Sequence, residues 1–187
     1  MINSFDASLY KLINQTLTND VLDFLMLKFS DKYFWIPFYC ILIWLISKQF
    51  GKKTLLILLF VGLSVLISDR FTSGVMKPGF ARLRPCHEAS LTPRQIEGVH
   101  CSNTGSMASS HAANHFAVAV FMISLFGTKK VANVTFWLFW ASAVAYSRVY
   151  CGVHYPTDVI VGGLIGAALG QLCYYFYLKT LKRIKWD

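Results

Sequence analysis

Apolar residues are concentrated in five long runs, and polar residues lie in the segments between them. A helix rises about 1.5 Å per residue, so each run with its flanks can cross a hydrocarbon core of about 30 Å. This pattern predicts an all-α, polytopic membrane bundle of about five transmembrane helices. The runs cover roughly residues 34–50, 54–75, 107–127, 131–147 and 158–178.

Two segments outside these runs complete the predicted architecture. Residues 1–33 mix apolar and polar positions and predict amphipathic helices that lie at the membrane surface. Residues 76–106 predict a long loop on one side of the bundle. Small residues at four-residue spacing in the last run predict close packing against another helix: Gly162, Gly166 and Gly170. We therefore expect residues 1–187 to form one membrane-embedded domain.

Composition supports a membrane protein. The chain is 55% hydrophobic and 14% charged with a mean hydropathy of +0.48, whereas soluble domains are about 25% charged. The net charge of +9 does not indicate a nucleic-acid ligand, because the basic residues form short clusters between the apolar runs.

The clusters also predict an orientation. The connections "SKQFGKK" and "GTKK" and the tail "KTLKRIKWD" together hold nine of the 18 basic residues and one of the nine acids. Basic loops favour the cytoplasmic side. We therefore expect a multi-pass membrane protein with a cytoplasmic C-terminus, and its small size and short loops favour a bacterial cytoplasmic membrane. Residues 76–106 then face the periplasm or the exterior.

Three polar clusters converge on that outer side. They are "KPGFARLRP" at residues 77–85, "MASSHAANH" at residues 107–115 and "SRVYCGVHYPTD" at residues 147–158. A single charge at a membrane boundary is commonly a snorkelling anchor. Three clusters of different chemistry on one face instead indicate a reactive site.

The residue types in these clusters favour phosphoryl transfer. Lys77, Arg84 and Arg148 supply fixed positive charge, and arginine forks match the geometry of phosphate oxygens. Ser109 and Ser110 begin a helix, where hydroxyl and backbone N–H groups favour an anion. We predict that these five residues bind phosphate.

Three further residues are the candidate catalysts. His154 and Asp158 stand four apart, so the carboxylate can hold one ring nitrogen while the other attacks phosphorus. His111 remains to protonate the departing oxygen. The clusters therefore contain a nucleophile, the carboxylate that orients it and a general acid.

The three clusters resemble the signature motifs of the phosphatidic acid phosphatase type 2 superfamily, which also includes vanadium-dependent haloperoxidases. Lys77 to Arg84-Pro85 meets the first motif, and Ser147-Arg148, His154 and Asp158 meet the third. The middle motif, normally Pro-Ser-Gly-His, reads Ala108-Ser109-Ser110-His111, so Ser110 replaces a glycine.

The resemblance implies a metal-independent membrane lipid phosphatase with a phosphohistidine on His154 and no cofactor. Undecaprenyl diphosphate and phosphatidylglycerol phosphate are the favoured substrates, and lipid A phosphate and phosphatidic acid are alternatives. A lipid phosphotransferase or a haloperoxidase-like enzyme are alternative functions, and a transporter is disfavoured because the charges gather at one surface. The expected partners are the lipid substrate and the bilayer, with no nucleic acid and no obligate protein partner.

Four other residues carry open interpretations. Cys86 and Cys101 flank the outer loop and are a possible disulfide in an oxidising compartment. His115 follows His111 at zinc-ligand spacing, but the glutamate of a metalloprotease motif is missing. Arg82 either contacts substrate or lies on the surface.

Overall fold

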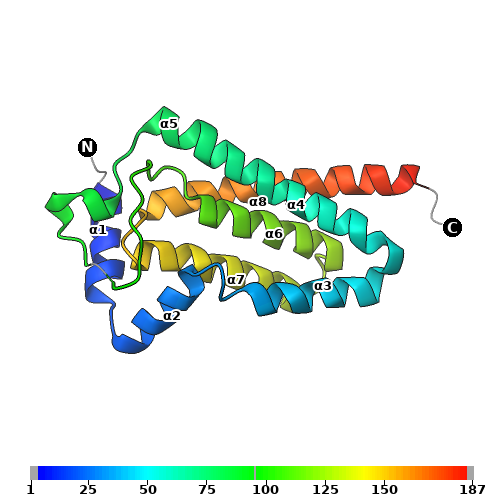
Figure 1. The fold of residues 1–187 in the computed structure, drawn as a ribbon, viewed down its shortest axis with the longest axis horizontal. Helices are drawn as coiled ribbons and strands as arrows, with labels where there is room; N and C mark the ends of the chain where they lie inside the picture. Colours follow the sequence, from blue (N-terminus) through cyan, green and yellow to red (C-terminus); the bar gives the residue numbers. More distant parts are fainter. Residues whose placement is uncertain (1–3, 95, 185–187) are drawn as a thin grey trace.

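The computed structural model describes residues 4–94 and 96–184, and its long helices run side by side along one axis (Figure 1). Each predicted apolar run corresponds to one long helix. These are α3 (Ile36–Phe50), α4 (Thr54–Phe71), α6 (Ser110–Phe126), α7 (Val131–Tyr150) and α8 (Pro156–Arg183), and α7 and α8 extend beyond their runs. The tail charges Lys185 and Asp187, which entered the orientation argument, lie outside the described residues.

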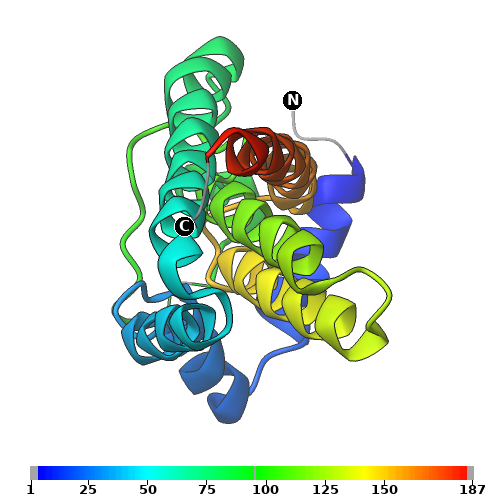
Figure 2. The ribbon, with the colours of Figure 1, turned by 90° about the vertical axis from the view of Figure 1, so that its right-hand side faces the viewer.

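Helix α6 lies between its neighbours when the bundle is viewed along its long axis (Figure 2), and it packs against α4, α7 and α8. A Cβ atom on Gly162, Gly166 or Gly170 of α8 would overlap backbone carbonyl groups of α6. The glycine spacing therefore lets the two backbones approach closely, as the sequence predicts.

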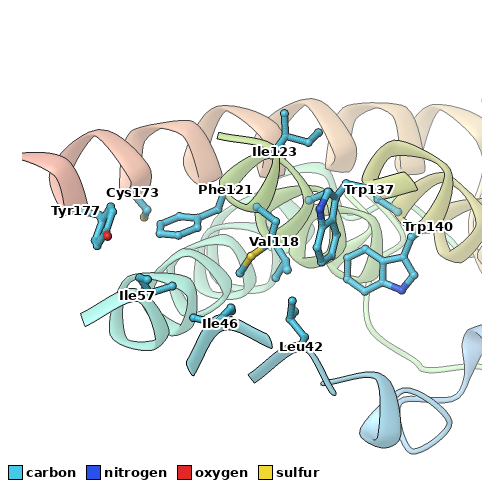
Figure 3. Packing of buried hydrophobic residues seen from close by; sticks show 13 residues of the cluster. Leu42, Ile46, Ile57, Val118, Phe121, Ile123, Trp137, Trp140, Cys173 and Tyr177 are labelled. Atoms are coloured by element: carbon cyan, nitrogen blue, oxygen red, sulfur yellow. The ribbon is translucent and has the colours of Figure 1, made fainter. Parts of the chain in front are cut away.

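Aromatic and aliphatic side chains fill the space between the helices (Figure 3). Phe121 of α6 and Trp137 and Trp140 of α7 are buried there with Ile46 of α3 and Ile57 of α4. Other large apolar side chains of the long helices point outward and are exposed. An apolar exterior around an apolar core is the pattern of a helical bundle whose solvent is lipid.

The five-span count remains a prediction. Within the described residues, two stretches are long and apolar enough to cross a bilayer by length and composition, Ile36–His87 and Pro156–Arg183. The first stretch contains both α3 and α4, between which the chain reverses at Gly51. Helix α6 is apolar but shorter.

The N-terminal helices and the long loop lie at one end of the bundle (Figure 1). The chain there begins with α1 (Ser4–Lys11), a π-helical turn (Leu12–Thr16) and α2 (Asp20–Ser30). Helix α4 extends into this end through a second π-helical turn (Thr72–Met76) and the short α5 (Lys77–Phe80). Short 3-10 turns at Pro85–His87 and Ala89–Leu91 and the disulfide between Cys86 and Cys101 shape the loop that follows.

The N-terminal segment, predicted to lie at the membrane surface, is also packed into the protein. Asp6, Tyr10 and Asn14 are each 1% exposed or less. The side chain of Asn14 donates to the carbonyl of Tyr150 at 2.8 Å, which ties the segment to the end of α7. The N-terminal segment therefore packs against the residues that join α7 to α8.

Candidate active site

A polar cavity of about 560 Å³ lies at the end of the bundle where α6 and α8 begin and α7 ends. The three polar clusters of the sequence meet there. Six of the eight predicted site residues line the cavity, and they are Lys77, Arg84, Ser110, His111, Arg148 and His154.

His154 lies in the loop between α7 and α8, and its side chain is 2% exposed. Its Nε2 atom is 3.3 Å from Nη1 of Arg84, and its Nδ1 atom is 3.4 Å from Oδ2 of Asp158. A guanidinium group only donates hydrogen bonds, so Nε2 carries the lone pair and the ring proton lies on Nδ1. The nucleophilic nitrogen therefore faces the cavity, and the protonated one faces the carboxylate.

Burial lowers the pKa of His154 to about 4, with the nearby charge of Arg84 adding to the effect and Asp158 opposing it. Desolvation disfavours the charged form of an imidazole. At neutral pH His154 is therefore uncharged, as a nitrogen nucleophile must be.

Asp158 is fully buried, and both of its carboxylate oxygens are held. Oδ2 accepts a hydrogen bond from the backbone N–H of Tyr155 at 2.8 Å, and Oδ1 accepts one from Nη1 of Arg82 at 2.9 Å. These bonds close the first turn of α8 and fix the carboxylate toward His154. A fixed carboxylate keeps the imidazole in one tautomer and orientation.

Arg82 continues this chain of contacts to the N-terminal helix. Its Nη2 atom lies 2.6 Å from Oδ2 of Asp6, and Asp6 also accepts from the backbone N–H of Thr157 at 2.9 Å. Arg82 therefore supports Asp158 from behind, a role that was not considered from the sequence. Asp6 was not among the predicted site residues, because a lone acid near the N-terminus belongs to no motif.

Arg84 is placed by the outer loop. Its Nε atom donates to the carbonyl of Thr104 at 2.9 Å, and Nη1 donates to the carbonyl of Val153 at 3.0 Å. The guanidinium is 5% exposed and thus held between the loop and the segment that carries His154. The disulfide between Cys86 and Cys101 links the two sides of the same loop.

Arg148 lies in the last turn of α7. One Nη atom donates to the hydroxyl of Ser30, and the Arg148 carbonyl accepts from the backbone N–H groups of Val153 and His154 at 3.1 and 3.2 Å. Its Nε atom is buried without a hydrogen-bond partner among the described residues. This nitrogen is therefore free to donate to an anion in the cavity.

The two serines of the middle cluster have different environments. The hydroxyl of Ser110 is 2.8 Å from that of Thr72 and 3.1 Å from that of Ser73, at the cavity wall. Ser109 is fully buried as the N-cap of α6, and its backbone N–H donates to the carbonyl of Asp158 at 3.0 Å. Ser109 therefore joins α6 to α8, and its predicted direct contact with phosphate has no support in this geometry.

The cavity also contains residues that the sequence analysis did not select. Asp69 and Ser73 stand on the same face of the α4 extension as Lys77, and Asn114 and His115 follow His111 on α6. Their spacing is a usable signal, because residues four apart share one helix face. His100, Ser102 and Thr104 of the loop and Lys32, just after α2, also line the cavity.

The two candidate metal-ligand groups are otherwise engaged. Nδ1 of His115 donates to the carbonyl of His111 at 2.8 Å, so this ring is held along its own helix. Cys86, His87 and Cys101 place ligand atoms within 4.8 Å of one another, but the two thiols are joined as a disulfide. The cysteine group therefore offers no free thiolate, and Nδ1 of His115 is not available as a ligand.

A model of the PAP2 superfamily matches residues 53–182, well over half of the chain. The chain belongs to this superfamily. A lipid A 4'-phosphatase of Bacteroides thetaiotaomicron is 30% identical over 168 residues, which are 88% of this chain and 74% of the relative. One from Porphyromonas gingivalis is 34% identical over 82% of this chain and 65% of its own length.

Solved PAP2 structures have the same fold. Aquifex aeolicus LpxE matches with a TM-score of 0.69 and 24% identity, and the match covers 91% of this chain and 95% of that protein. A Bacillus subtilis PAP2-type phosphatidylglycerolphosphate phosphatase matches with a TM-score of 0.64 and 25% identity, over 97% and 87% of the two chains. The region matched to the superfamily starts after α3, so Asp6 and Asn14 lie outside it.

Proposed function

We propose that this PAP2 protein is a membrane lipid phosphatase in which His154 carries the phosphoryl group. The observation that supports this most is the position of Nε2 of His154, unprotonated, beside Arg84 and in one cavity with Lys77, Arg148 and His111. A nucleophile surrounded by fixed cations suits an anionic transferring group.

The first step breaks the phosphoester bond. The lone pair on Nε2 of His154 attacks phosphorus, the bond between phosphorus and the lipid oxygen breaks, and His111 gives its proton to that oxygen. Asp158 stabilises the positive charge that develops on the imidazole, because its carboxylate faces the protonated Nδ1 at 3.4 Å. The products are a lipid alcohol, or a lipid monophosphate from a diphosphate, and phosphohistidine.

The second step regenerates the enzyme. His111, now neutral, takes a proton from a water molecule, and the resulting hydroxide attacks phosphorus. The bond between phosphorus and nitrogen breaks, inorganic phosphate leaves and His154 regains its lone pair. The positive charge needed to hold the phosphoryl group in both steps comes from Lys77, Arg84 and Arg148.

The proposed substrate is a phosphate or diphosphate at the head of a membrane lipid. Named relatives include lipid A 4'-phosphatases and an undecaprenyl-diphosphatase of Sulfolobus acidocaldarius, which is 28% identical over 90% of this chain. Because of these relatives, we treat a lipid A phosphate as a leading candidate substrate and not only as a possible one. We further propose five membrane spans, a cavity that faces the periplasm or exterior, and a cytoplasmic C-terminus.

The test is phosphate release by the detergent-purified protein, with and without excess EDTA, from lipid A phosphate, phosphatidylglycerol phosphate, undecaprenyl diphosphate and phosphatidic acid. Release should persist in the chelator and fall by at least about 10⁴-fold in His154→Ala, because the nucleophile is lost. Ser124→Ala, at the far end of α6, is the matched control and should retain full activity. Loss of activity in EDTA, or an active His154→Ala variant, would contradict the mechanism.

A further inference from the structure

The cavity has two chemically different layers along its helices. Lys77 and Arg84 belong to a cationic layer near the end of the bundle, which His111 also lines. Asp69 lies two helical turns before Lys77, and Asn114 and His115 lie one turn beyond His111, deeper along the bundle axis. The deeper layer is therefore built from hydrogen-bond acceptors and an amide, and the outer layer from cations.

The deeper layer is unsuited to phosphate. Phosphate oxygens accept hydrogen bonds, and the carboxylate of Asp69 repels them. Asp69 is near enough to Lys77 for an electrostatic interaction, but no ion pair joins the two among the described residues. This acid is therefore available to a donor group that enters the cavity.

His115 presents a second acceptor. Its Nδ1–H donates to the carbonyl of His111 at 2.8 Å, so in the neutral ring Nε2 can only accept. Nε2 of His115 and Oδ1 of Asn114 are buried without hydrogen-bond partners in the part of the chain that the structure describes. Buried polar groups of this kind are stabilised by a partner, and a ligand with donors can supply it.

We propose that Asp69, Asn114 and His115 form a headgroup subsite that selects lipid phosphates carrying a hydroxyl or amine close to the phosphate. The proposal rests on the proposed function, in which His111 protonates the oxygen that leaves with the lipid. The group bonded to that oxygen then lies on the His111 side of the cavity, where Asn114 and His115 follow on the same helix face.

This chemistry separates the substrate classes. A glycosyl phosphate such as lipid A, or phosphatidylglycerol phosphate, carries donors on the group next to the phosphate. Undecaprenyl diphosphate and phosphatidic acid carry no hydroxyl or amine there. Lys32 also lines the cavity and is a cation that a second phosphate could contact. Undecaprenyl diphosphate is therefore the most informative donor-free lipid to compare.

The experiment measures kcat/KM for these four lipids in detergent micelles, for the unmodified protein and for His115→Phe and Asp69→Asn. His115→Phe keeps a ring against Trp140, whose ring centre is 4.9 Å away, and removes Nε2. Asp69→Asn keeps the size and removes the charge. Ser124→Ala on the same helix is the control, and elution as a single detergent-solubilised species checks folding.

The unmodified protein should prefer the donor-bearing lipids. Each variant should lower the ratio of kcat/KM between donor-bearing and donor-free lipids by about tenfold, the usual size of one lost hydrogen bond. A ratio unchanged in both variants, or a preference of the unmodified protein for the donor-free lipids, would overturn the subsite while leaving the phosphatase in place. No release from any lipid would overturn the proposed function and the subsite with it.

Discussion

The N-terminal segment, Ser4–Ser30, and the motif-bearing region, residues 77–158, contribute to the same site in different ways. The motif region supplies most of the charged and nucleophilic groups of the cavity. The N-terminal segment holds that region from behind, through Asp6 on Arg82, Asn14 on Tyr150 and Asp23 on Arg94. The motif region therefore holds groups that touch the substrate, and the N-terminal segment holds groups that keep them in place. Substitutions in the two regions should have different effects.

The largest effect expected outside the cavity is that of Asp6→Asn. The loss of this carboxylate charge weakens the hold on Arg82, and through Arg82 on Asp158 and His154. Removing such outer partners typically costs about 10- to 100-fold in activity. We expect kcat to fall by this factor with little change in KM.

A double-mutant cycle with Arg82→Gln tests the connection. If Asp6 acts through Arg82, the double variant should be about as active as Arg82→Gln alone. Additive losses would mean that the two residues act independently. A lower folded fraction with an unchanged kcat per folded molecule would reduce Asp6 to a stabilising role.

The pH dependence of kcat/KM tests a residue of the cavity itself, His154. Protonation of Nε2 removes the nucleophile, so activity falls as the pH drops toward the pKa of His154, which burial lowers from 6.5 to about 4. At pH 5.5 an imidazole with a pKa of 6.5 would already lose about tenfold. We expect nearly full activity there, and an acid limb near pH 6.5 would show that His154 is solvated.

The lowered pKa of His154 also predicts how the free energy of unfolding depends on pH. Because the folded-state pKa of His154 is lowered, the unfolded chain binds a proton first as the pH falls below 6.5. The contribution of His154 to the free energy of unfolding is therefore present above pH 6.5 and is lost as the pH falls through about 4. Thermal unfolding measured across this range checks the sign.

The sequence predicts the residues that line the cavity better than it predicts the residues that hold them in position. Apolar periodicity locates the long helices because each must bury one face. Motif spacing locates His154 and Asp158 because they stand four residues apart across the start of α8. The contact between Asp6 and Thr157 joins residues 151 positions apart, and no local pattern encodes it. The contact between Ser109 and α8 likewise depends on where α8 packs, because the backbone N–H of Ser109 donates to the carbonyl of Asp158.

Gly152 is the point where the N-terminal segment contacts the loop that carries His154. Its φ is +76°, and a Cβ there would lie 3.0 Å from the Tyr10 hydroxyl and 3.2 Å from Nδ2 of Asn14. We expect Gly152→Ala to lower the free energy of unfolding by about 1–3 kcal/mol, from backbone strain and crowding together.

Gly98→Ala separates the two causes. Gly98 also has a positive φ, +87°, but open space surrounds its Cβ position. Gly98→Ala should lower the free energy of unfolding through backbone strain alone, by about 1 kcal/mol. The difference between the two variants, measured by thermal unfolding, reports the contact with Tyr10 and Asn14. Equal losses would contradict a close fit between the N-terminal segment and the loop.

The smallest effect is expected at the outer edge of the N-terminal segment, where Asp23 binds Arg94. The two carboxylate oxygens lie 2.8 Å from the two Nη atoms, and Oδ1 also accepts from the Tyr150 hydroxyl at 2.5 Å. The pair is partly exposed, so solvent screens it. We expect Asp23→Asn to cost about 1 kcal/mol or less, a drop of about 2–4 °C in Tm.

Asp20→Asn is the matched control, because Asp20 is an exposed acid in the same first turn of α2. The hydrogen bond from Arg94 holds the pKa of Asp23 below its ordinary value of 3.8. The stability that Asp23 contributes is therefore present above pH 3.8 and is lost as the pH falls through its lower, folded-state pKa. The Tm difference between the unmodified protein and Asp23→Asn should shrink with acidification. A Tm difference that stays constant into acid would mean that Asp23 acts through packing, and the N-terminal segment would then be held chiefly by Asp6 and Asn14.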